Sequence, residues 1–122
     1  MHQPIRYKAF TFFDIGEDHP YFDEPLNEKV LHSVAERCYE PAIQHILKLL
    51  KKFPHDFFVS FSISGSLLEQ CRTYRPGLIP RLQELAAHPN VELLGETYYH
   101  SLSYFYNCDA FKKEIKKHRE VM

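Results

Sequence analysis

The sequence predicts an α/β fold with a parallel sheet, of which this chain supplies only a part. Two short segments rich in aromatic and β-branched residues, 57–63 and 91–95, have the composition of strands. Two helical segments lie between them, and a strand–helix–strand connection of this kind is right-handed and makes the strands parallel. Because a parallel sheet buried on both faces needs more than two strands, we expect the chain to belong to a larger fold.

The size and charge of the chain narrow its class. At 122 residues it falls within the range of one domain and can bury a sizeable core without disulfides or metals. Its net charge of −1 argues against nucleic-acid binding. Three cysteines without metal-binding spacing, the lack of a secretory apolar stretch and the lack of a membrane-spanning one indicate a cytoplasmic protein with no membrane partner.

The first half of the chain combines a loop with two helices. Residues 1–26 follow neither a helical nor a strand period, and we expect a long ordered loop whose many aromatic rings are buried. From Asn27, a candidate N-cap, apolar residues recur at helical spacing as far as Tyr39. Pro41 is expected to open a second helix, which Pro54 ends.

The second half contains both predicted strands and three helices. Ser66 and Glu69 match a capping box, so a helix is expected to begin directly after the first strand. A Pro-Gly pair separates this helix from another at residues 78–87, which precedes the second strand. A last amphipathic helix is expected from about Asp109.

Polar side chains follow both predicted strands at the point where each strand ends. Residues 62–66 follow the first strand, and residues 95–101, which include Glu96, Tyr98 and His100, follow the second. Ligands of parallel α/β sheets bind at the carboxyl ends of the strands, so these two loops form the candidate site. Capping and ordinary surface exposure are the alternative explanation, which spacing alone leaves open.

Two further patterns involve acidic residues. Glu92 stands between apolar neighbours inside the second predicted strand, so it is either paired in a buried sheet or turned toward solvent at an edge. The N-terminal loop is rich in acidic and imidazole groups but has no metal-binding motif, so we expect no metal and no other cofactor. The residues considered for a metal are His2, Asp14, Glu17, Asp18, His19, Asp23 and Glu24.

Along nearly all of its length the chain resembles the N-terminal portion of the catalytic domain of glycoside hydrolase family 57. The resemblance rests on the order of seven segments: HQP at 2–4, FDIG at 13–16, FD at 22–23, CYxP at 38–41, FSISG at 61–65, LEQ at 68–70 and VELLGETYYHS at 91–101. It implies a partial (β/α)7 barrel, TIM-like and of the glycoside hydrolase and deacetylase type, truncated at both ends. Residues 1–122 would form a single segment of that domain. The family includes α-amylases and 4-α-glucanotransferases.

The resemblance also implies a set of site residues. It places His2 and Glu92 at the sugar-binding centre, with Glu96, Tyr98 and His100 beside them. The family's nucleophilic glutamate and acid aspartate belong to motifs without a counterpart in this sequence, so no residue here is expected to be catalytic. Because a retaining glycosidase needs both carboxyl groups, we expect the chain alone to bind an α-glucan or maltooligosaccharide without cleaving it.

Three functions remain open at this point. The first is a fragment of an α-glucan-acting retaining glycoside hydrolase or glucanotransferase, with a second polypeptide completing the barrel. The second is a noncatalytic sugar-binding or interaction module. The third is a polysaccharide deacetylase-like enzyme, which needs an Asp-His-His metal set that we cannot assemble here. Open sheet edges and apolar helix faces, at Leu47 and Leu50 and at Phe111 and Ile115, lead us to expect self-association.

Overall fold

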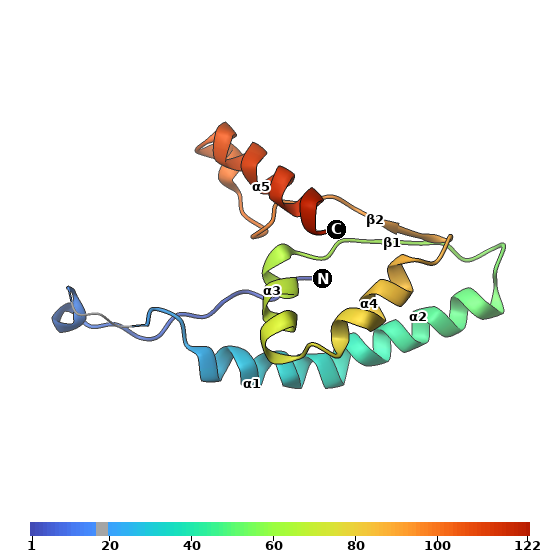
Figure 1. Ribbon diagram of the computed structural model, residues 1–122, viewed down its shortest axis with the longest axis horizontal. Coiled ribbons are helices and arrows are strands. Elements are labelled where there is room, and N and C mark those ends of the chain that lie inside the picture. Colours follow the sequence, from blue (N-terminus) through green and yellow to red (C-terminus); the bar gives the residue numbers. More distant parts are fainter. Residues whose placement is uncertain (17–19) are drawn as a thin grey trace.

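The computed structural model describes residues 1–16 and 20–122. It contains a two-stranded sheet, a long helical layer and an extended N-terminal arm (Figure 1). Three of the residues considered above for a metal, Glu17, Asp18 and His19, lie outside the described part. Within the described part, no helix is both long and apolar enough to cross a bilayer.

The sheet is parallel, as the sequence predicts. Strand β1 (Val59–Phe61) pairs with β2 (Val91–Leu93), and Ser60 lies opposite Glu92. Helices α3 (Gly65–Tyr74) and α4 (Leu78–Ala86) connect the two strands. The prediction of adjacent parallel strands joined by two helices is therefore confirmed, although both strands are shorter than the predicted segments. The class is α/β, and completion of a barrel stays a prediction.

The two helices predicted before the sheet are continuous. Helix α1 (Glu24–Val34) passes through a π-helical turn, η2 (Ala35–Tyr39), into α2 (Glu40–Lys52). Pro41 has no N–H to donate, so an ordinary helical bond to the preceding turn is lost there. In the wider turn just before it, the Glu40 N–H donates to the Ala35 carbonyl. This turn keeps the helix continuous from α1 into α2.

Both predicted N-caps are displaced. Helix α1 begins before Asn27, because the Asp23 carboxylate accepts the N–H of Leu26. Helix α3 begins with Ser64 as its N-cap, and the Ser64 hydroxyl accepts the N–H of Leu67. The prediction of Ser66 as the cap is therefore wrong by two residues. In both cases a side chain upstream of the predicted cap, by four positions in α1 and by two in α3, reaches the unpaired amides of the first turn.

The core lies where α1 and α2 meet α3 and α4. It is built mainly from buried leucines, and Leu50 is one that has no exposed surface. The expectation of an exposed face at Leu50 is wrong, because α4 packs over that side of α2. Helix α5 (Cys108–Val121) begins close to the predicted position, capped by the Asn107 side chain, and its Ile115 is exposed.

The aromatic arm, residues 5–16 and 20–22, extends well away from the helices (Figure 1). Its two sides are joined by a bridge between Tyr7 and Phe22 and by a bond from the Lys8 N–H to the Tyr21 carbonyl. A short 3-10 helix, η1 (Phe12–Asp14), lies farther out along it. The expectation that its rings are buried is wrong: Phe13 is 89% exposed. A narrow two-stranded ribbon has no second layer to cover its faces.

Candidate functional site

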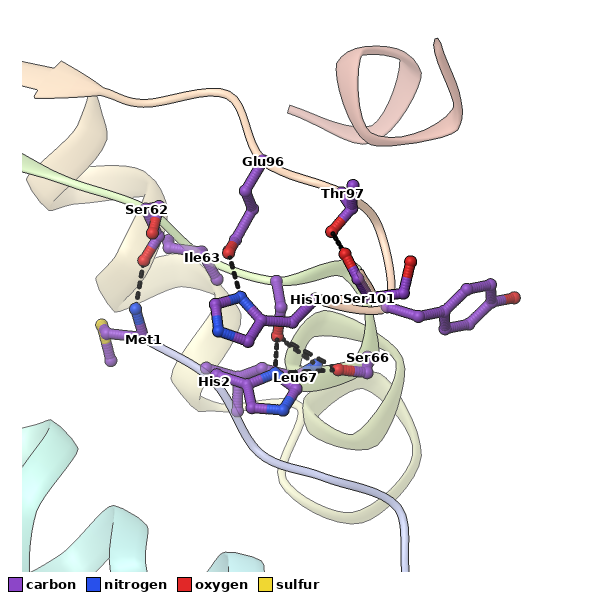
Figure 2. A network of polar contacts seen from close by, with 12 residues as sticks. Met1, His2, Ser62, Ile63, Ser66, Leu67, Glu96, Thr97, His100 and Ser101 are labelled. Atoms are coloured by element: carbon purple, nitrogen blue, oxygen red, sulfur yellow. Dashed lines mark hydrogen bonds and ion pairs between the residues drawn. The ribbon is translucent and has the colours of Figure 1, made fainter. Parts of the chain in front are cut away.

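The segment that carries the HQP motif runs beside the end of β1. The Met1 amino group donates to the Ser62 carbonyl, and the Ser64 N–H donates to the Met1 carbonyl at 2.9 Å. This is the hydrogen-bond pattern of a parallel ladder, on the edge of β1 opposite β2. His2 therefore stands at the carboxyl end of the strands, where Figure 2 shows it beside the loop that follows β2.

Buried side chains fix the backbone around His2. The Tyr39 hydroxyl donates to the His2 carbonyl at 3.1 Å. The Gln70 amide donates to the Gln3 carbonyl at 2.8 Å. We call α1, η2, α2, α3 and α4 together the helical body. Because these donors come from η2 and α3, two separate parts of the helical body hold the HQP motif in place without a ligand.

The imidazole of His2 has partners on one side. Its Nδ1 lies 2.9 Å from the Ser64 hydroxyl, and that hydroxyl lies 3.1 Å from the Ser66 hydroxyl. Among the described residues, no hydrogen-bond partner is found for Nε2 of His2. The ring is thus oriented by two serines at the β1–α3 junction, and its other nitrogen can meet a ligand.

The loop after β2 brings a carboxylate and a second imidazole to His2. The Glu96 Oε2 lies 2.7 Å from the His100 Nδ1. The His100 ring stacks on the His2 ring, with centroids 4.5 Å apart and planes 26° from parallel (Figure 2). The structure therefore gathers His2, Glu96 and His100 at the predicted place, and we call these three residues the His-Glu-His cluster.

The electrostatics of the cluster favour a neutral His2. Burial lowers the pKa of His2, and the neighbouring His100 lowers it further, against an opposing effect of the Glu96 carboxylate. The second oxygen of Glu96, Oε1, is buried and has no hydrogen-bond partner in the described structure. A buried acceptor without a donor is uncommon, so the protein itself leaves the Glu96 carboxylate only half satisfied.

The conformation of the loop is unusual at His100. Its φ is +56°, in the left-handed region that non-glycine residues seldom occupy. The His100 N–H closes a turn onto the Thr97 carbonyl at 2.9 Å. On α5, the Glu114 carboxylate accepts the N–H of Tyr99 and the hydroxyl of Ser101. Backbone strain of this kind persists only where surrounding contacts hold it, and here α5 supplies them.

Tyr98 packs the loop against the body. Its ring lies against Gly65, where a Cβ would be 2.4 Å from the ring atoms. Its hydroxyl donates to Glu69 at 2.8 Å, and the Lys117 ammonium lies 3.8 Å from the ring centroid. Burial and the bond to Glu69 raise the pKa of Tyr98. Since the side chain is enclosed, Tyr98 presents no free surface to a ligand here, and its predicted contact with substrate stays a prediction.

Glu92 lies apart from the cluster. It is exposed, and it accepts a hydrogen bond from its cross-strand neighbour Ser60 at 2.9 Å. The residues on either side of it, Val91 and Leu93, pack against the core, so Glu92 lies on the opposite face of the strand. The solvent-facing alternative is therefore the correct one for its environment, while its predicted role in sugar binding stays untested.

Within residues 1–16 and 20–122, no three His, Cys, Asp or Glu side chains are arranged to hold a metal ion. The deacetylase interpretation needs such a set and gains no support from these residues.

Sequence reasoning found the residues of the site only in part. Ser64, Ser66 and Tyr99 lie in the two loops predicted as the candidate site, but the spacing of Ser66 to Glu69 suggests only capping. Glu114 carries no sequence signal that links it to the site. The position of the two serines and of Tyr99 after a strand end is the one usable indication.

A parallel sheet that gathers imidazole and carboxylate groups where its strands end is the arrangement that α/β enzymes use for their sites. The profile of Glycosyl hydrolase family 57 matches residues 1–122. The chain belongs to glycosyl hydrolase family 57. It is 38% identical over 102 residues to a protein of Methanocaldococcus jannaschii named "Putative alpha-amylase". That match covers 83% of this chain and 21% of the relative. The comparison with solved structures found no significant match.

Proposed function

We propose that this chain provides sugar-binding groups to an α-glucan-acting retaining glycoside hydrolase or glucanotransferase. The observation that carries the proposal is the His-Glu-His cluster, which lies at the carboxyl ends of two parallel strands in a chain of glycosyl hydrolase family 57. The relative from M. jannaschii, named as an alpha-amylase, supports an α-glucan as the substrate.

The chemistry of the cluster suits a sugar. A neutral His2 can donate or accept a hydrogen bond through Nε2, and a glucose hydroxyl can do both. The enclosed, unpartnered oxygen of Glu96 becomes available to a glucose hydroxyl when the carboxylate turns toward the ligand, and a bond to a charged acceptor is stronger than one between neutral groups. His100 is exposed, so its ring is accessible to the ligand.

We propose that the nucleophile and the acid lie outside this segment. A retaining glycosidase places two carboxyl groups about 5–5.5 Å apart across the scissile bond. In the cluster Glu96 is the one carboxylate, and it is occupied by His100. Because the chain spans about a fifth of the relative that it matches, the remaining parts of the barrel, in the same or a second polypeptide, would supply both groups.

A noncatalytic sugar-binding module is the second candidate. It is favoured by the same observation, a binding cluster without a catalytic pair. The two candidates differ in one respect: addition of the complementary barrel segment would produce hydrolysis or glucan transfer in the first case and no turnover in the second.

We further propose a cytoplasmic location, since Cys38, Cys71 and Cys108 are free thiols.

Calorimetric titration with maltohexaose tests the proposed binding. Replacement His2→Ala removes the ring that contacts Ser64 and His100, and we expect at least a roughly tenfold weaker affinity. His55→Ala is the matched control, since His55 is exposed and outside the site. Equal affinities of the wild type and His2→Ala would contradict the proposal.

A further inference from the structure

A groove opens directly beside the His-Glu-His cluster. Its volume is about 430 Å³, which falls within the range of small-molecule sites. His2 and Ser66 form the end of the groove nearest the cluster. The other walls come from the base of the aromatic arm and from the loop after β2. The groove is therefore continuous with the proposed sugar site.

Three aromatic side chains from three separate places in the sequence line this groove. Tyr7 and Phe22 belong to the two sides of the arm, and Tyr99 belongs to the loop after β2. Their exposed fractions are 67%, 41% and 47%. A cluster of exposed aromatic side chains beside polar groups is typical of a binding surface and not of a core.

The three rings are held in position without a ligand. The rings of Tyr7 and Phe22 contact each other, with centroids 5.4 Å apart. Between them and the body, the buried Asn27 accepts the Arg6 N–H at 2.8 Å and donates to the Arg6 carbonyl at 3.1 Å. The Tyr99 hydroxyl accepts a hydrogen bond from Lys117 at 2.6 Å. Such preorganisation lowers the entropic cost of binding.

We propose that the groove is a second sugar subsite, which binds the glucosyl unit next to the one held by the His-Glu-His cluster. This inference rests on the proposed function and extends it to the length of glucan that the chain recognises. A pyranose ring has an apolar C–H face and a rim of hydroxyls. The C–H face packs on aromatic rings, and the hydroxyls meet the serine, imidazole and phenol groups of the same groove.

The arm contains a matched control for this subsite. Tyr21 and Phe10 form a second ring pair, also with centroids 5.4 Å apart, outside the groove. Tyr21 is 67% exposed and Phe10 41%, the same fractions as Tyr7 and Phe22. The two pairs therefore differ in their position relative to the groove and not in exposure or ring contact.

Titration of the 122-residue chain and its variants with glucose, which can fill only the cluster, and with maltohexaose, which can also reach the groove, provides the test. For Tyr7→Ala we expect maltohexaose affinity to fall roughly three- to tenfold and glucose affinity to change less than about twofold. Tyr7→Phe keeps the ring and is expected to stay within about twofold of the wild type for both sugars. Tyr21→Ala is expected to bind both sugars as the wild type does.

The possible outcomes separate this inference from the proposed function. If His2→Ala weakens binding while Tyr7→Ala behaves like Tyr21→Ala, the second subsite is wrong and the proposed function stands. If the wild type binds neither sugar, both are wrong. If Tyr7→Ala leaves sugar affinity unchanged but shifts the sedimentation coefficient toward monomer, a second copy of the chain occupies the groove and the subsite is overturned.

Discussion

The helical body and the aromatic arm use the same kinds of side chain for opposite purposes. In the body, apolar residues such as Leu31 and Leu67 are fully buried between helices. In the arm, Phe12 and Phe13 are largely exposed, and the backbone is held by a few hydrogen bonds between its two sides. The high aromatic content of the chain therefore reflects both core packing and exposed surface.

This difference separates what gives stability from what meets a ligand. The body has the buried area that makes a fold stable, and its side chains Tyr39 and Gln70 fix the backbone at His2. The described arm has little buried area, so we expect its local stability to be low. Substitutions in the body should change the free energy of unfolding, whereas substitutions at the arm residues that line the groove, Tyr7 and Phe22, should change binding.

The largest expected effect comes from opening the core. Leu31→Ala should lower the free energy of unfolding by about 3 kcal/mol, because it removes buried methyl groups and leaves a cavity. Phe13→Ala, at an exposed position in the arm, should change it by less than about 0.5 kcal/mol. Urea denaturation followed by circular dichroism measures both. Equal effects at the two positions would remove the distinction between body and arm.

Gly65 tests the contact between the body and the loop that carries His100. Gly65→Ala places a methyl group within 2.4 Å of the Tyr98 ring, which is itself fixed by its hydroxyl, so we expect a loss of about 2 kcal/mol. Gly77→Ala is the control, since no atom lies within 4 Å of a Cβ there. Denaturation of both variants provides the comparison. Unchanged stability of Gly65→Ala would show that Tyr98 does not pack in this way.

Asn27 tests the joint between the body and the arm. Asn27→Ala leaves the Arg6 N–H without its partner and removes one of two donors to the Arg6 carbonyl, which keeps the Asp23 N–H, and we expect a loss of about 1–2 kcal/mol. The amide of Lys8, which bonds the Tyr21 carbonyl, should also exchange with deuterium faster. Asn27→Asp keeps the acceptor and loses the donor, so its effect should be intermediate. Unaltered exchange at Lys8 in Asn27→Ala would mean that the arm holds its shape without this joint.

The titration of His2 gives the smallest and most local effect. Its pKa in the folded chain should lie below 6.5, measured by NMR of the ring protons. Removing the Glu96 charge with Glu96→Gln should lower the pKa further, and His100→Ala, which removes a repelling charge and part of the burial, should raise it. A higher His2 pKa in Glu96→Gln together with a lower His2 pKa in His100→Ala would contradict the described arrangement.

The same shift predicts a pH dependence of stability. The unfolded chain binds a proton to His2 more readily than the folded chain does, so protonation of His2 favours unfolding. The contribution of neutral His2 to the free energy of unfolding is therefore complete above pH 6.5. It is lost as the pH falls from 6.5 through the lower folded value. His2→Gln should remove this part of the acid sensitivity.

The sequence predicted the parallel strands because residues 57–63 and 91–95 combine strand composition with two intervening helices. The position after a strand end predicted that Glu96 and His100 share one end of the sheet, and the resemblance to the family added His2 and Glu92. Glu92 lies apart from the other three because it sits on the solvent-facing side of its strand. The π-helical turn before Pro41 was not predictable, because helical spacing does not register one extra residue in a turn. The exposure of the arm's rings depends on whether another layer covers them, and none of the described elements does so, which no local pattern encodes.

The central claim is that the His-Glu-His cluster binds an α-glucan, and ring NMR of the histidines tests it most directly. On titration with maltohexaose, the ring signals of His2 and His100 should shift together and saturate with a single dissociation constant. The signals of exposed His55 provide an internal reference and should not move. Unperturbed His2 and His100 signals at saturating sugar, or equal shifts at all three histidines, would contradict the claim.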